Sequence, residues 1–134
     1  MRERLARERQ VIAVDLPGFG AVTVDLRSAT GDPREQTDID TDAMQLCEAA
    51  LESGHGAFIH CLDTSKTGLC GISRGAARAV MRAAPGRALA LVDASEGRIY
   101  PGEVRRDIAH GAMVLVTGSQ FIGGPPFSAA LLLP

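Results

Sequence analysis

The feature that most constrains the fold is an alternation of amphipathic segments and short apolar runs along most of the chain. The order from residue 43 onward is helix, strand, helix, strand, helix, strand, strand, with the segments at 41–53, 56–62, 73–84, 88–92, 101–108, 113–117 and 127–133. Such alternation predicts a mostly parallel sheet with helices on its faces, so the predicted class is α/β. The last connection is too short for a helical crossover. We therefore expect 127–133 to pair antiparallel or to reach elsewhere in the sheet.

Local signals set the expected ends of these elements. Asp40 or Thr41 can cap the first helix, and Gly54 can stop it. Ser73 can cap the second helix, and Pro101 suits the first turn of the third. The run 88–92 is apolar without interruption, which predicts a strand covered on both faces.

The first forty residues carry weaker signals. Residues 1–10 are mostly charged and are interpreted as an N-terminal extension, and 11–134 as a single α/β domain. Two β-branched runs, 11–16 and 21–26, flank a Pro-Gly-Phe-Gly connection and predict a hairpin. The polar stretch 28–38 is expected to be a loop.

Composition excludes several classes of function. The net charge of −2 gives no footprint for nucleic acid, and no apolar run approaches the length of a membrane span. Three cysteines in or beside apolar segments are typical of reduced thiols, so we expect a cytoplasmic protein. The chain has a single lysine, Lys66, which limits any chemistry that needs a lysine amine.

Polar residues follow the apolar runs, where an open α/β sheet binds its ligands. Asp93 ends one run, and a site role and a role as a turn or helix cap are about equally consistent with it. His60 belongs to a polar cluster at the end of the preceding run. The spacing of His55, His60 and Cys61 matches no closed zinc pattern, so no metal site is predicted. A Cys61 nucleophile activated by His60 is disfavoured, because neighbours on a strand point to opposite faces.

Charged and glycine-rich segments also have plain structural interpretations. Arg74, Arg78 and Arg82 repeat every four residues and are expected to form an exposed cationic row. The turn 123–126, Gly-Gly-Pro-Pro, lacks the lysine and spacing of a phosphate-binding P-loop, and a tight connection is its simplest role.

Two segments together resemble a known family. Val92-Asp93-Ala94-Ser95-Glu96 and the segment 116–126, Val-Thr-Gly-Ser-Gln-Phe-Ile-Gly-Gly-Pro-Pro, are similar to class V aminotransferase-type enzymes. These are pyridoxal-phosphate (PLP) proteins of fold type I, and the likeness, which includes Ser65-Lys66-Thr67-Gly68, covers roughly residues 20–134. The resemblance implies part of the large domain of such an enzyme, and an amino acid as a small-molecule ligand.

The resemblance also implies roles for individual residues. Asp93 would contact the pyridine nitrogen, where a carboxylate keeps the ring protonated and electron-withdrawing. Glu96 would lie near the ring oxygen, and Thr117 and Ser119 near the phosphate. His60 and Thr67 would line the same pocket. Gln120 stands where the family has its Schiff-base lysine, and an amide cannot form a Schiff base, so no catalytic residue is assigned.

Three functions follow as hypotheses. The first is a PLP-dependent aminotransferase-like domain or fragment that is impaired alone and that a second chain would complete. The second is a non-catalytic interaction or scaffold domain, whose truncated sheet exposes apolar surface and favours a homo-oligomer or a complementary chain. The third is a different small α/β enzyme that uses Asp93, His60 or Cys61 directly, although no triad spacing supports it.

Overall fold

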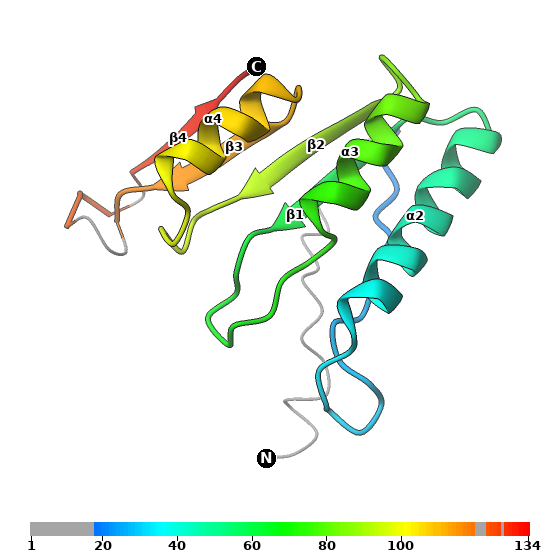
Figure 1. The fold of residues 1–134 in the computed structure, drawn as a ribbon, viewed down its shortest axis with the longest axis horizontal. Coiled ribbons are helices and arrows are strands. Elements are labelled where there is room, and N and C mark those ends of the chain that lie inside the picture. Colours follow the sequence, from blue (N-terminus) through cyan, green and yellow to red (C-terminus); the bar gives the residue numbers. More distant parts are fainter. Residues whose placement is uncertain (1–17, 120–122, 127) are drawn as a thin grey trace.

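The fold is an open four-stranded sheet with three helices, seen in a computed structural model that describes residues 18–119, 123–126 and 128–134. The predicted extension 1–10 and the predicted strand 11–16 lie outside the described residues. Figure 1 labels the elements, whose order is α2 (Gln36–Glu52), β1 (Ala57–Leu62), α3 (Arg74–Ala83), β2 (Ala88–Asp93), α4 (Pro101–Ala109), β3 (Met113–Thr117) and β4 (Ala129–Leu132). The α/β class is confirmed.

The strands lie in the order β1-β2-β3-β4, so each strand pairs with the next one in the chain. β1, β2 and β3 are parallel, with Ala57 opposite Ala88 and Leu91 opposite Met113. β4 is antiparallel to β3, as the short connection before it predicts.

Helix α2 begins at Gln36, four residues before the expected start at Asp40, so the prediction of a loop throughout 28–38 was wrong. Glu35 precedes the helix in an extended conformation, and Asp38 places a negative charge in the first turn, where the helix dipole favours it. Asp40 has a different role. Its Oδ1 accepts hydrogen bonds from the backbone N–H of Ser73 at 2.7 Å and from Gln36 Nε2 at 2.9 Å, which joins α2 to the start of α3.

The starts of α3 and α4 follow their sequence signals. The Ser73 hydroxyl accepts a hydrogen bond from the N–H of Ala76 at 3.1 Å, so the predicted cap is confirmed. Pro101 occupies the first turn of α4, and Glu103 accepts a hydrogen bond from the backbone of Tyr100 at 3.1 Å.

The two faces of the sheet differ in burial. Figure 1 shows α3 and α4 on the same side of the sheet, with α2 beside α3. On that side small and branched side chains are buried, among them Ile59, Cys61, Ala90, Val92 and Val114. The other side carries Phe58, Leu89 and Leu131, which are 55%, 53% and 51% exposed. The expectation that 88–92 is covered on both faces was therefore wrong for the described part of the chain.

The segment 18–35 precedes α2 in the chain and lines a cavity together with α2 and β1. The predicted strand at 21–26 is absent from it, and its isolated bridge joins Arg27 to Pro33. Alternating β-branched residues favour an extended backbone, but a strand also needs a partner, and the run forms no ladder with β1. Val24 instead packs against the core.

Among the described residues, no helix is both long enough and apolar enough to cross a membrane.

Candidate functional site

The carboxyl ends of β1, β2 and β3 meet at one edge of the sheet, where Figure 1 shows the connections that follow them. These connections carry most of the residues singled out from the sequence. Parallel strands bring such ends together because every helical crossover returns the chain to the opposite edge.

Asp93 and His60 form the centre of the candidate site. Asp93 is the last residue of β2, and His60 lies on β1, two residues before the partner of Asp93 in the register. Their side chains share one face of the sheet, the face opposite the helices. His60 Nε2 lies 3.1 Å from Asp93 Oδ2, and the two side chains are 31% and 12% exposed.

The second oxygen of Asp93 accepts a hydrogen bond from the backbone N–H of Ser95 at 3.0 Å. The hydrogen bond with His60, followed by those with Ser95, lowers the pKa of Asp93 to about 2 from its usual 3.8, against the opposing effect of burial. Asp93 is therefore an ionised carboxylate at neutral pH. It caps the local turn through Ser95, as one of the two interpretations of the sequence has it, and its other oxygen faces His60. The site role of Asp93 stays a prediction.

Thr117 is linked to the same loop. Its Oγ1 donates to the carbonyl oxygen of Ser95 at 2.8 Å, which joins the carboxyl end of β3 to that of β2. The structure thus brings His60, Asp93 and Thr117 into one network, in which Ser95 is the link that sequence reasoning missed as a site residue. A serine two residues after a strand-ending aspartate is a common turn pattern and was the available signal.

The other predicted site residues are less closely joined. Glu96 is buried at 8% exposure, and no described residue forms a hydrogen bond or ion pair with its carboxylate. Thr67 is exposed in the connection after β1, where its hydroxyl lies 3.0 Å from that of Ser65. Ser119 is half-buried just after β3, and Gln120 lies outside the described residues.

Backbone hydrogen bonds of two glycines, Gly118 and Gly124, join described residues on either side of 120–122. The N–H of Gly124 donates to the carbonyl of Gly118 at 2.8 Å, and the N–H of Gly118 donates to the carbonyl of Ser128 at 3.0 Å. A Cβ on Gly124 would lie 2.8 Å from the Gly118 oxygen, closer than real Cβ atoms approach. Gly124 is therefore required by close backbone contact, as expected for a tight connection.

A second charged cluster lies on the covered face and was not predicted. Arg74 donates from Nη2 to Asp63 at 2.5 Å and from Nε to Asp107 at 2.8 Å. The expectation of an exposed row through Arg74 was wrong for this residue, because α4 supplies a carboxylate that is buried at 2% exposure. The missed signal was Asp107 on the inward stripe of α4 with Val104 and Ile108.

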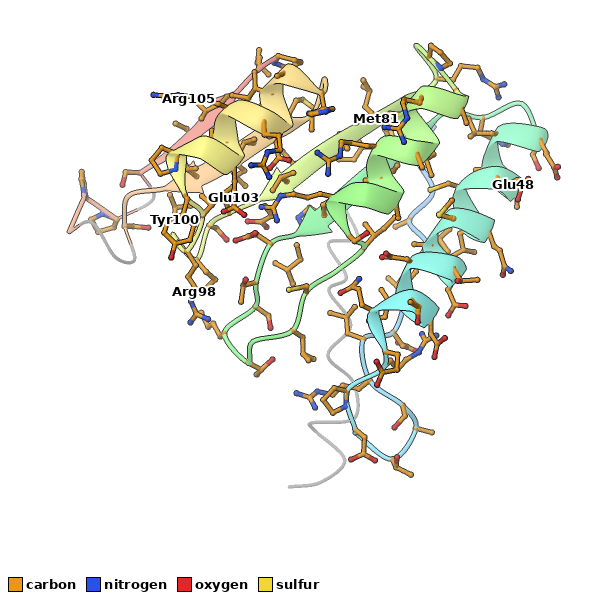
Figure 2. The ribbon with its side chains drawn as sticks, viewed as in Figure 1. Glu48, Met81, Arg98, Tyr100, Glu103 and Arg105 are labelled. Carbon is orange, nitrogen blue, oxygen red and sulfur yellow. The ribbon has the colours of Figure 1, made fainter. Side chains whose placement is uncertain are left out.

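Other reactive groups are poorly placed for chemistry. Burial raises the pKa of Cys61 to about 12, which leaves it protonated and a weak nucleophile at neutral pH. Lys66 is exposed in the connection after β1. Arg98 is exposed at the site edge, where Figure 2 shows it near Tyr100 at the start of α4.

Within 18–119, 123–126 and 128–134, no three His, Cys, Asp or Glu residues are grouped to hold a metal ion. Comparisons with models of protein families, with curated proteins and with solved structures find no match to this chain.

Proposed function

We propose that this chain is part of the large domain of a PLP-dependent, class V aminotransferase-like protein, impaired in catalysis alone, and that it binds the cofactor without a covalent bond. The observation that carries the proposal is the ionised carboxylate of Asp93 at the carboxyl end of β2. Bound pyridoxal phosphate supplies an electron-withdrawing ring, which is effective when its pyridine nitrogen is protonated.

Asp93 has the properties that a partner for a pyridinium nitrogen needs. It keeps its negative charge through hydrogen bonds from its neighbours, and its side chain remains 12% exposed. His60 fixes one oxygen and the Ser95 N–H fixes the other, so the carboxylate has a defined orientation. A carboxylate can accept further hydrogen bonds in addition to these two.

The remaining residues fit the cofactor only in part. Thr117 and Ser119 follow the neighbouring strand and provide hydroxyls at the same edge, although Thr117 already donates to Ser95. The sequence does not fit the covalent bond between the cofactor and a lysine. Gln120 has no amine, and the only lysine belongs to the connection after β1. The proposal is therefore one of binding and orientation, with a second chain as the source of missing groups.

The test is a titration of the protein with pyridoxal phosphate, followed by ¹⁵N–¹H chemical shifts and by absorbance. We expect reversible binding with shifts centred on Asp93 and Ser95. Asp93→Asn should weaken binding about tenfold to a hundredfold, because it removes a charge-assisted hydrogen bond. Asp38→Asn, which changes an exposed acid on α2, is the matched control and should bind as the unchanged protein does.

Gln120→Lys tests the covalent position. In a Lys66→Arg background it should gain an adduct that borohydride traps, and mass spectrometry should locate the adduct at residue 120. If neither the unchanged protein nor Gln120→Lys binds pyridoxal phosphate, with or without a partner chain, the proposal fails.

The open face of the sheet favours a second candidate, a non-catalytic interaction domain. Phe58, Leu89 and Leu131 are each more than half exposed. Phe58 and Leu89 are partners in the register of β1 against β2, and Leu131 lies on β4 at the other edge of the sheet. Exposed apolar surface on a sheet face marks association sites in many proteins. A homo-oligomer or a complementary chain that covers this face would remove it from water.

Sedimentation over a range of protein concentrations tests the second candidate. We expect the chain to associate, and we expect a Phe58→Ser, Leu89→Ser double variant to abolish that association. Arg105→Ser, which changes an exposed residue of α4, should leave the association intact. A monomer at all concentrations that also binds no partner chain would count against this candidate.

A further inference from the structure

A cavity of about 270 Å³ runs along β1, from Gly56 just before the strand to Leu62 at its carboxyl end, and it reaches Gly71 and Ile72 in the connection that follows. Segment 18–35, helix α2 and β1 all contribute to its walls. The main apolar side chains that line it are Val22, Val24, Ile39, Ala43, Phe58 and Ile59. An apolar cavity of about 150 Å³ already holds a benzene ring, so this one has room for a ring with substituents or a short chain.

The described lining offers no partner to a charged ligand. None of the described residues that line the cavity is an Asp, Glu, Lys or Arg. A charge placed among such walls loses its hydration without gaining a partner. His60 does line the cavity, but its Nε2 is committed to the Asp93 carboxylate.

Besides Thr23, two kinds of hydrogen-bonding group reach the cavity. The Asp93 contact leaves Nδ1 of His60 without a partner among the residues that the structure describes. The second is the edge of β1 that faces away from β2. Ala57 N–H donates to the carbonyl of Arg87, just before β2, and Asp63 N–H donates to that of Asp93 at the end of β2. The alternation along β1 therefore turns the backbone groups of Phe58 and His60 away from β2. No described strand pairs with that edge.

We infer that this cavity is a binding site for a small, uncharged, mainly apolar molecule that carries one hydroxyl group, bound through His60 and the outer edge of β1. A hydroxyl both donates and accepts. It can therefore donate to Nδ1, which is the acceptor of a neutral ring whose Nε2–H is bonded to Asp93, and it can pair with either backbone group. Sites for small molecules commonly combine apolar walls with a few polar groups in this way. The doubly charged phosphate of pyridoxal phosphate makes that cofactor unsuitable here, so this inference goes beyond the proposed function.

The test compares three probes of one shape, p-cresol, p-xylene and p-toluate, by calorimetry and by ¹⁵N–¹H chemical shifts. We expect p-cresol to bind with shifts at β1 and α2. It should bind about fivefold to tenfold more tightly than p-xylene, which lacks the hydroxyl hydrogen bond. No binding of p-toluate is expected. Absence of p-cresol binding, or equal binding of p-cresol and p-toluate, would overturn the inference.

Two variants locate the site. Ala50→Leu fills the cavity from α2 and should reduce p-cresol affinity at least tenfold, while Ala49→Leu, exposed on the same helix, should leave it unchanged. His60→Phe should remove the preference for p-cresol over p-xylene. That preference is a ratio within one variant, so it remains informative if His60→Phe is less stable.

Circular dichroism and thermal unfolding confirm that each variant is folded before binding is measured. Unchanged affinity in Ala50→Leu, or an unchanged preference in His60→Phe, would contradict the assignment. Ala50→Leu should still bind pyridoxal phosphate as the unchanged protein does, so failure of this inference and failure of the proposed function are distinguishable.

Discussion

The two faces of the sheet use carboxylates in opposite ways. On the covered face Asp107 is 2% exposed and Arg74 lies between it and Asp63, so the charges are committed to each other. On the open face the Asp93 and His60 pair keeps its access to solvent. The covered cluster joins α3, α4 and the connection after β1, whereas the open pair joins two strands and leaves room for a ligand. Burial thus separates a structural cluster from a candidate site within one small sheet.

The covered cluster should give the largest effect on stability. Arg74→Met leaves Asp107 and Asp63 without their cation, and breaking a buried pair in this way costs about 3–5 kcal/mol in the free energy of unfolding. Urea unfolding measures it. Arg78→Met, one turn along the same helix and without an ion pair among the described residues, is the control and should change the free energy by less than about 0.5 kcal/mol. Equal losses of unfolding free energy in both variants would show that the ion pairs of Arg74 do not stabilise the covered face.

The open pair should give a smaller effect that depends on pH. The pKa of Asp93 is lowered in the folded protein to about 2 from 3.8, so its contribution is present above about pH 4. That contribution is lost as the pH falls to about 2, and it amounts to at most about 2 kcal/mol. Asp93→Asn should flatten this part of the stability profile, measured by urea unfolding from about pH 5 to about pH 2. Asp38→Asn should keep it, and a profile that is unchanged in Asp93→Asn would show that the pair contributes nothing.

On β2, an apolar side chain on the open face can be compared directly with one on the covered face. The open-face variant should have the smallest effect on the free energy of unfolding. Leu89→Ala on the open face should change the free energy of unfolding by less than about 0.5 kcal/mol in the monomer. Val92→Ala on the covered face, where the side chain is 2% exposed, should cost about 2 kcal/mol. If Leu89→Ala costs as much, and the cost grows with protein concentration, association covers the open face.

The sequence was most informative where local chemistry decides the structure. The strands β1 to β4 and the cap at Ser73 were predictable, because periodicity and capping depend on neighbours in the chain. The start of α2 was missed, since Gln36 and Asp38 have ordinary helix-compatible chemistry but resemble a polar loop.

Contacts between distant segments were not predictable. Asp93 and His60 were each placed in the candidate site, but their 3.1 Å contact depends on the register of β1 against β2. Likewise, the role of Arg74 depends on where α4 puts Asp107. The strand expected at 21–26 failed for a related reason, because extended backbone becomes a strand only when a partner edge pairs with it.

The strand order has a consequence for how the molecule forms during synthesis. Each strand pairs with the one made just after it, so the sheet can grow in one direction as the chain leaves the ribosome. β1 and β2 can pair as soon as α3 connects them, and β3 and then β4 add to the growing edge. His60 and Asp93 would therefore come into contact before Thr117 has been synthesised. Thr117 would then join a pair that has already formed.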